Sequence, residues 1–283
     1  MGWNAGLGMS DNAAMGRVKM LHHVIVGQGT PLLILHGSRL DHRHMLESLE
    51  PVFQELDGWQ RVYVDMPGHG LSPAQDNIHT QDDLLAAVMA FAAEALPSQQ
   101  FAIIGESRGS YLARGFAHLR PDLVSGVALI VPGGSPTADP ARLPIHQVLE
   151  PDPSIRPELL DNEIVRFDTF MVVQSYDIVE KTRRSKIPAF DLWNADQEAR
   201  VSQSFDFAFD VRGETSVFEG PSLIVAGRQD SMSGYLDAVD LLPQFPRASL
   251  AVLDAAGHGL AWERPELFNA LLRDWLRRLA LQT

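Results

Sequence analysis

The chain has 283 residues, of which 45% are hydrophobic and 21% charged, and it carries a net charge of −13 and no cysteine. The lack of cysteine excludes disulfide bonds, thiolate metal sites and a cysteine nucleophile. The acidic balance argues against nucleic acid or an anionic membrane as a partner, and no apolar run reaches the roughly 18 residues that a membrane span needs. We therefore expect a globular, cytoplasmic protein.

The N-terminal part divides into a lead and the first strands. Residues 1–16 are glycine-rich and aperiodic, so we expect a flexible lead there. From Arg17 to Val26 the pattern is strand-like, and a glycine-containing turn leads to the run Leu32–Leu35. That run is continuously apolar, which is typical of a strand covered on both faces of a parallel sheet.

The rest of the chain alternates between strand-like and helix-like patterns. Strand-like runs occupy residues 61–64, 101–104, 126–131, 222–226 and 249–253, and helix-like patterns occupy residues 80–96, 107–119, 233–242 and 265–281. Such alternation indicates right-handed crossovers between parallel strands. The predicted fold class is α/β: a doubly wound, mostly parallel, eight-stranded sheet with helices on both faces.

The alternation stops in one long segment, residues 133–215. Its apolar residues have helical spacing, and it contains no clear strand run. We predict an inserted helical cap over residues 133–215, with the α/β core formed by residues 17–132 and 216–283.

A serine stands where a predicted strand meets a predicted helix, in FAIIGESRGSYLARGFAHL, residues 101–119. A chain that changes from strand to helix within about three residues strains the backbone of that serine and leaves no room for a Cβ two residues to either side. Gly105 and Gly109 occupy those two positions. The pattern predicts a nucleophile elbow with Ser107 as the nucleophile.

A serine hydroxyl needs a base to take its proton, and the base needs a group that orients it. His258, one of ten histidines, lies between two glycines just after the last strand run, and we predict that it is the base. Asp230 lies three residues after the glycine that ends a strand run and is the predicted acid, with Asp254 as its rival. We expect no metal at His22-His23 or at residues 41–44, and this chemistry implies no cofactor.

An oxyanion hole and substrate contacts complete the predicted site. The backbone N–H of Arg108, next after the nucleophile, and that of Ser38, in the loop after the second strand run, are the predicted oxyanion donors. The guanidinium of Arg108 either grips a substrate carboxylate or pairs with Glu106, Glu263 or a cap carboxylate. Trp262 either contacts substrate or packs against the last helix.

Five motifs in order, LILHGS, VYVDMPGHGLS, IIGESRG, LIVAGRQD and AAGHGLAWERP, resemble those of the α/β-hydrolase fold superfamily. The resemblance covers the chain from Val18 to Leu281. It implies that Ser107, Asp230 and His258 form a catalytic triad under a lid of residues 133–215. The serine at position 107, where the dehalogenase and epoxide-hydrolase branches use aspartate, argues against those branches.

The predicted function is a serine hydrolase that cleaves a small-molecule ester or related acyl substrate through an acyl-enzyme intermediate. The cap favours a bounded pocket for a small molecule. Three alternatives stay open: a C–C bond hydrolase, a prolyl-iminopeptidase-like aminopeptidase, and a non-enzymatic receptor that retains the fold. In the aminopeptidase, acids of the cap would take the free amino group; the candidates are Glu150, Asp152, Glu158, Asp161 and Glu163. A homodimer is also left open.

Overall fold

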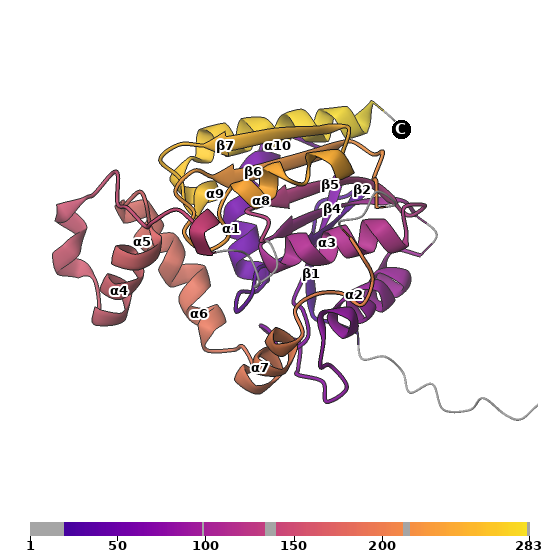
Figure 1. Cartoon of the computed structure of the whole chain (residues 1–283), viewed down its shortest axis with the longest axis horizontal. Coiled ribbons are helices and arrows are strands. Elements are labelled where there is room, and N and C mark those ends of the chain that lie inside the picture. Colours follow the sequence, from indigo (N-terminus) through magenta and orange to yellow (C-terminus); the bar gives the residue numbers. More distant parts are fainter. Residues whose placement is uncertain (1–19, 98, 134–139, 212–215, 282–283) are drawn as a thin grey trace, which may run out of the picture.

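The computed structural model describes residues 20–97, 99–133, 140–211 and 216–281, so the predicted lead at residues 1–16 lies outside the described residues. The strands are β1 (His23–Val26), β2 (Thr30–Leu35), β3 (Trp59–Val64), β4 (Phe101–Glu106), β5 (Val124–Ile130), β6 (Ser222–Gly227) and β7 (Ala248–Leu253). The helices that alternate with them are α1 (His42–Phe53), α2 (Gln81–Ala95), α3 (Arg108–Leu119), α8 (Leu236–Val239), α9 (Leu260–Glu263) and α10 (Pro265–Ala280), with a 3-10 turn, η4 (Leu242–Gln244) (Figure 1). No helix in these ranges is both long and apolar enough to cross a membrane.

The strands form a single sheet in the order β1-β3-β2-β4-β5-β6-β7, in which β1 runs antiparallel to β3 and the other neighbours are parallel. The prediction of a doubly wound, mostly parallel sheet is confirmed. The described residues contain seven strands rather than the predicted eight. The strand-like pattern starts at Arg17, but pairing begins at His23 opposite Val64, where β3 ends. Met20 and Leu21 lie outside the paired stretch, and residues 17–19 lie outside the described residues.

Helices cover both faces of the sheet, as predicted, because consecutive strand residues point to opposite sides. Leu33 and Leu35 of β2 belong to the core shared with α2 and α3, whereas Leu32 and Ile34 belong to the core shared with α1 and α10. All four side chains are fully buried. This burial on both faces explains why the run of β2 is apolar without alternation.

Two helical regions differ from the sequence-based expectation. Helix α1 was not predicted; it begins where the Asp41 carboxylate accepts a hydrogen bond from the backbone N–H of Arg43 at 3.0 Å, an N-cap that ends the preceding loop. The helix predicted over residues 233–242 is shortened to α8 and a 3-10 turn. Gly234 has φ of +69°, so the helical conformation cannot start before it.

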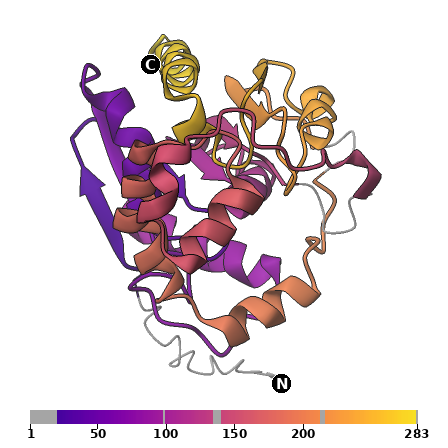
Figure 2. The same ribbon diagram turned by 90° about the vertical axis from the view of Figure 1, so that its left-hand side faces the viewer.

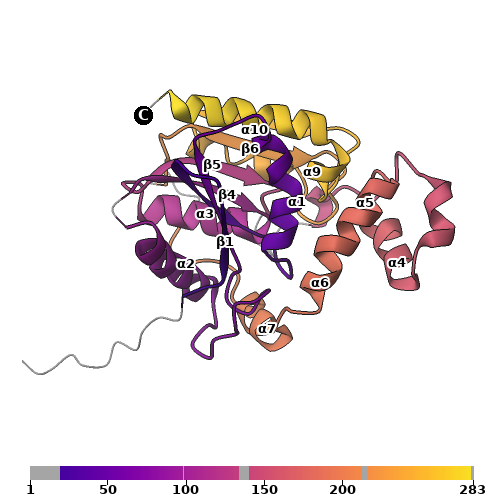
Figure 3. The same cartoon turned by 180° about the vertical axis from the view of Figure 1, so that it is seen from behind.

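In its described parts, the segment between β5 and β6 contains helices joined by loops and no strand, apart from one isolated β-bridge between Glu150 and Val173. It contains η1 (Pro140–Arg142), η2 (Pro153–Glu158), α4 (Asp161–Phe170), α5 (Tyr176–Lys181), the π-helical turn η3 (Thr182–Lys186), α6 (Ile187–Phe190) and α7 (Ala195–Gln203). Helices α4, α5 and α6 project beyond one end of the sheet, as the views from the front and from behind agree (Figures 1 and 3). Seen from that end, the segment lies in front of the sheet (Figure 2). Part of each predicted cap boundary, at residues 134–139 and 212–215, lies outside the described residues.

Candidate active site

Ser107 lies at the turn between β4 and α3, in a backbone conformation with φ of 52° and ψ of −115°. Positive φ is uncommon for a residue with a side chain and costs on the order of 1–3 kcal/mol. The two flanking glycines make the turn possible. A Cβ on Gly105 would lie 2.3 Å from the carbonyl oxygen of Gly109, and a Cβ on Gly109 would lie 2.3 Å from that of Leu35. The steric reason predicted for both glycines is confirmed.

Asp230 and His258 are joined by a hydrogen bond between loops that follow β6 and β7. Oδ2 of Asp230 lies 2.9 Å from Nδ1 of His258. Oδ1 accepts hydrogen bonds from the backbone N–H groups of Met232, at 2.8 Å, and Ser233, at 3.0 Å. The carboxylate is fully buried and held on both oxygens, so it orients the imidazole with Nε2 left for another partner.

The pKa of His258 reflects this pairing. Burial acts to lower the pKa, but the negative charge of Asp230 and its hydrogen bond outweigh burial, so that the pKa lies above the ordinary value for histidine. The rival acid, Asp254, is exposed, and its carboxylate accepts a hydrogen bond from the side chain of Gln229 at 2.8 Å. The geometry therefore distinguishes the two candidates: Asp230, not Asp254, contacts the histidine.

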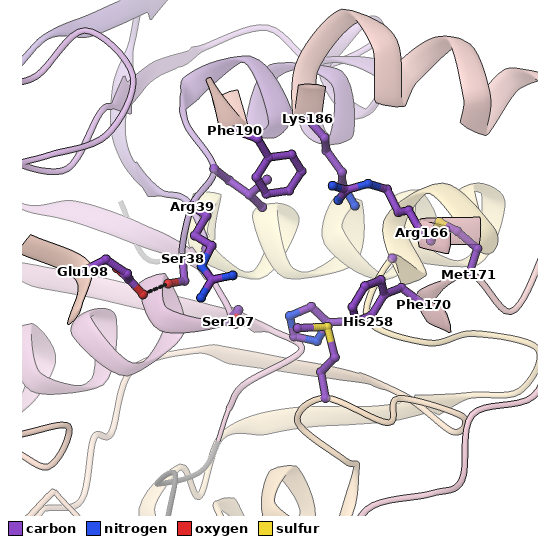
Figure 4. Close-up of a pocket in the computed structure, with 14 residues that line it drawn as sticks. Ser38, Arg39, Ser107, Arg166, Phe170, Met171, Lys186, Phe190, Glu198 and His258 are labelled. Carbon is purple, nitrogen blue, oxygen red and sulfur yellow. Dashed lines mark hydrogen bonds between the residues drawn. The ribbon is translucent and has the colours of Figure 1, made fainter. Parts of the chain in front are cut away.

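A cavity of about 410 Å³ brings residues of the core and of the segment between β5 and β6 together (Figure 4). Ser107 and His258 both line it. The full set of lining residues is Gly37, Ser38, Arg39, Leu40, Ser107, Arg166, Phe170, Met171, Lys186, Phe190, Glu198, Met232, His258 and Gly259. It lies beyond the carboxyl ends of the parallel strands, where ligands bind in open α/β sheets.

The loop after β2 lies directly against Ser107. A Cβ on Gly37 would come within 3.4 Å of the Cβ of Ser107, and the next residue, Ser38, lines the cavity. Arg108 is the first residue of α3, and the first N–H groups of a helix have no partner within the helix. The two predicted oxyanion donors thus belong to two segments that both lie next to Ser107.

The side chain of Arg108 is engaged by a carboxylate of α7. Its Nη1 lies 2.5 Å from Oε2 of Glu198, and its Nη2 lies 2.7 Å from Oε1. Arg108 is 5% exposed and does not line the cavity. The geometry matches pairing with a carboxylate of the predicted cap, which was one of the two roles considered for this guanidinium, and both terminal nitrogens are engaged by that carboxylate.

Trp262 lies behind the cavity wall rather than in it. Its side chain is 3% exposed, and its ring is 4.8 Å from the ring of His44 and 4.4 Å from Nζ of Lys186. Of the two roles considered for Trp262, this position matches packing. The tryptophan supports Lys186, which does line the cavity.

The sequence analysis missed three cations that line the cavity: Arg39, Arg166 and Lys186. Within the described residues none of them forms an ion pair with a carboxylate. Arg166 lies 4.0 Å from the ring of Phe190, and burial lowers the pKa of both Arg166 and Lys186. Figure 4 shows both head groups directed into the cavity. Of the three, only Lys186 belongs to a basic run in the sequence, residues 183–186, which the structure forms into the π-helical turn η3.

The histidines for which metal binding was not expected lie in hydrogen-bonded clusters. Asp65 accepts hydrogen bonds from Nδ1 of His22 at 2.7 Å and Nδ1 of His42 at 2.8 Å. The backbone N–H groups of His42 and Leu71 also donate to this carboxylate, at 2.8 and 3.0 Å. The three possible ligand atoms lie within 4.8 Å of one another, but these hydrogen bonds already account for the carboxylate oxygens.

Comparisons with known proteins agree with this architecture. A family model described as the alpha/beta hydrolase fold matches residues 30–159. A 2-hydroxy-6-oxononadienedioate/2-hydroxy-6-oxononatrienedioate hydrolase of Pseudomonas putida is 26% identical over an alignment of 269 residues that covers 91% of each chain. A hydrolase of the same name from Escherichia coli strain K12 is 22% identical and covers 93% of each chain.

Solved structures show the same fold. An alpha/beta superfamily hydrolase from Oenococcus oeni PSU-1 superposes with a TM-score of 0.85 at 24% identity, covering 93% of this chain and 97% of the other. A thermophilic esterase from Thermogutta terrifontis superposes with a TM-score of 0.66 at 21% identity, covering 92% and 93%. The chain has the α/β-hydrolase fold. At the level of the hydrolase class, the functional prediction is confirmed.

Proposed function

We propose that this protein is a serine hydrolase that cleaves a small acyl substrate carrying a carboxylate group, with Ser107, His258 and Asp230 as its catalytic triad. The observation that carries the proposal is the 2.9 Å hydrogen bond that Asp230 accepts from a histidine that shares a cavity with Ser107. A buried acid, an oriented imidazole and a strained serine at the start of a helix are the parts that this chemistry needs.

In the proposed reaction, Nε2 of His258 takes the proton of the Ser107 hydroxyl as the serine oxygen attacks the substrate carbonyl carbon. Asp230 holds the imidazole by Nδ1 and stabilises its positive charge. The imidazolium then gives its proton to the leaving group, and an acyl-enzyme remains. A water molecule deprotonated by His258 attacks the acyl carbon, and the serine takes the proton back as the acid product leaves.

The developing negative charge on the carbonyl oxygen lies, in this proposal, between the backbone N–H groups of Ser38 and Arg108. Both segments lie next to Ser107, which supports this assignment. The positive end of α3 adds to the stabilisation, because Ser107 immediately precedes its first turn.

The charge of the cavity supports an anionic substrate. Three cations line the cavity, and its one lining carboxylate within the described residues, Glu198, is already paired with Arg108. Arg166 contacts the ring of Phe190, and Lys186 contacts the ring of Trp262 and is within electrostatic reach of Glu106 and Glu263. Burial still lowers the pKa of both cations, so a ligand that carries negative charge would stabilise them in the cavity. The aminopeptidase alternative receives no support, because the five acids considered for its amino group do not line the cavity.

The bond that breaks defines two candidate reactions. Ester cleavage is the first, since the residues described supply all its steps. Cleavage of a C–C bond next to a carbonyl is the second, and it is favoured by the names of the Pseudomonas putida and Escherichia coli relatives. In that reaction the leaving carbon, rather than an oxygen, takes the proton from His258.

The division of the chain is part of the same proposal: residues 133–215 form a cap that bounds the cavity over a core of residues 17–132 and 216–283. Two of its helices contribute Arg166 and Glu198 to the cavity, and the π-helical turn η3 contributes Lys186. The homodimer and the cytoplasmic location stay predictions.

A labelling and substrate series tests the proposed function. A fluorophosphonate probe should label the wild-type protein at Ser107, located by peptide mass spectrometry, and should not label Ser107→Ala. The 4-nitrophenyl monoester of succinic acid should be cleaved with a higher kcat/KM than neutral 4-nitrophenyl butyrate. A 2-hydroxy-6-oxo dienoate should outperform both if the C–C reaction is the native one. An unlabelled Ser107 together with tight ligand binding would favour the receptor instead. A preference for proline 4-nitroanilide over both esters would overturn the proposal that the substrate is anionic.

A further inference from the structure

We infer that Glu198, on helix α7 of the cap, is a positioning residue for the oxyanion hole, so that the hole is complete only while α7 is docked on the core. The inference rests on the proposed function, because it concerns the same two donors, Ser38 and Arg108. It adds a component that neither the family motifs nor the comparisons assign.

A single carboxylate holds the side chains of both donor residues. Oε1 of Glu198 accepts hydrogen bonds from the hydroxyl of Ser38, at 2.5 Å, and from Nη2 of Arg108, at 2.7 Å. Oε2 accepts the second guanidinium bond, from Nη1, at 2.5 Å. Ser38 and Arg108 lie on different segments, so the shared oxygen Oε1 fixes the distance between the segments that carry the two N–H donors.

The hydrogen bonds of Glu198 are strong enough to hold the two donor segments at a fixed distance. Glu198 is 7% exposed and Arg108 is 5% exposed, so little water competes for either charge. The pair is bidentate and charge-assisted, the arrangement in which an arginine and a carboxylate have the best defined geometry. Burial acts to raise the pKa of Glu198, but Arg108 and Ser38 together hold the pKa below the ordinary range.

Helix α7 is itself anchored to the core beside Glu198. The neighbouring residue Gln197 donates a hydrogen bond from Nε2 to the carbonyl of Pro67 at 2.6 Å and accepts one from the backbone N–H of Gln75 at 2.8 Å. The backbone N–H of Asn194, the N-cap of α7, donates to the carbonyl of Gly68 at 2.7 Å. Three hydrogen bonds to the core loop of residues 67–75 therefore fix the position of Glu198. Movement of α7 would release both donor segments.

Oxyanion donors must stand about 2.7–3.1 Å from the oxygen, so small displacements have large effects on rate. A misplacement of about 1 Å can cost about 10²-fold. Glu198→Gln replaces one acceptor oxygen by an amide NH₂ that faces a guanidinium, which breaks the bidentate pair. We expect kcat on an ester substrate to fall about 10²-fold with KM changed less than about threefold.

The matched control is Asp196→Asn, which removes the same charge from an exposed position two residues earlier on α7. It should leave kcat and KM at the wild-type values. Glu198→Asp keeps the charge but shortens the reach, and it should recover part of the lost kcat. Binding of a boronic acid, whose tetrahedral adduct places an oxygen in the hole, should weaken in Glu198→Gln in parallel with kcat/KM.

Because Glu198→Gln leaves Arg108 buried without a full partner, the double variant Arg108→Met/Glu198→Leu serves as the folding control. It replaces the ion pair by apolar side chains while the backbone N–H of residue 108 remains. With an unchanged melting temperature and a full count of fluorophosphonate-titrated sites, it should still show the reduced kcat per site.

The outcomes separate this inference from the proposed function. Turnover retained by Ser107→Ala would overturn the proposed function and the inference together. An inactive Ser107→Ala combined with wild-type kcat per titrated site in Glu198→Gln would overturn the inference alone. Loss of folded protein with unchanged kcat per titrated site would likewise assign Glu198 a purely structural role and overturn the inference.

Discussion

His44 forms a buried hydrogen-bonded pair with Glu106, the residue that immediately precedes Ser107. Nε2 of His44 lies 2.8 Å from Oε1 and 2.9 Å from Oε2 of the carboxylate. Both residues are less than 5% exposed. The pair connects α1 to the last residue of β4, and the ring of His44 also packs on Trp262. It therefore ties the strand that presents Ser107 to the helix and tryptophan behind the cavity.

This pair predicts a stability effect. His44→Phe keeps a ring against Trp262 but leaves the Glu106 carboxylate buried without its donor, which should lower the free energy of unfolding by about 1–3 kcal/mol. Adding Glu106→Leu to that variant should restore much of the loss, because removing both partners is far less costly than removing one. Urea denaturation of the two single variants and the double variant measures the effect; additive losses would contradict it.

Asp230 and Asp254 predict different kinetic outcomes. Asp230→Asn should lower kcat by about 10⁴-fold while the protein stays folded, because the amide stabilises the wrong imidazole tautomer. Asp254→Asn is the matched change at an exposed carboxylate that bonds Gln229 and should leave kcat within about twofold. Steady-state kinetics on one ester substrate decides between them, and the reverse ranking would reassign the acid.

The raised pKa of His258 predicts the acid limb of the pH profile. The imidazole acts as a base only when neutral, so kcat/KM should rise with pH until His258 has lost its proton, with a midpoint above about 6.5, the ordinary value for histidine. Asp230 raises this pKa, so Asp230→Asn should move the midpoint to lower pH along with its reduced plateau. A midpoint below 6 in the wild-type protein would contradict the assigned pairing.

The same pKa has a consequence for stability, with its sign set by the direction of the shift. A group whose pKa is higher in the folded state than in the unfolded state stabilises the fold at pH below the unfolded value. This contribution is lost as pH rises through the folded pKa of His258. The wild-type protein should therefore lose stability, relative to His258→Gln, as pH rises above about 6.5, and melting temperatures across that range measure the difference.

Lys186 predicts the substrate charge preference. Lys186→Met should raise KM for the succinic acid monoester by about tenfold, the equivalent of about 1.4 kcal/mol, and leave KM for neutral 4-nitrophenyl butyrate unchanged. Lys181→Met, in the same helical run but paired with Asp177 on the surface, is the matched control. An equal change on both esters would place the role of Lys186 in cap packing, through its contact with Trp262, rather than in anion binding.

Much of the fold and the elbow could be predicted because they depend on neighbouring residues. The glycines around Ser107 are required by contacts within a few residues and with β2, and continuous apolar runs such as that of β2 indicate burial on both faces. Helix α1 was not predicted because residues 41–44 were considered only as possible metal ligands. Asp41 is nevertheless a residue type that commonly starts a helix, and its carboxylate does accept the N-cap hydrogen bond.

The sequence alone determined the alternation of strands and helices, the strained turn at Ser107 and the candidates for the triad, because backbone sterics and turn geometry act over short stretches of chain. Only the tertiary structure decided which carboxylate contacts His258, that Arg108 pairs with Glu198, ninety positions later in the chain, and that Arg166 and Lys186 face the same cavity. These pairings depend on how the helices between β5 and β6 pack against the end of the sheet. That path is set by the packing of the whole chain, and no local pattern contains it.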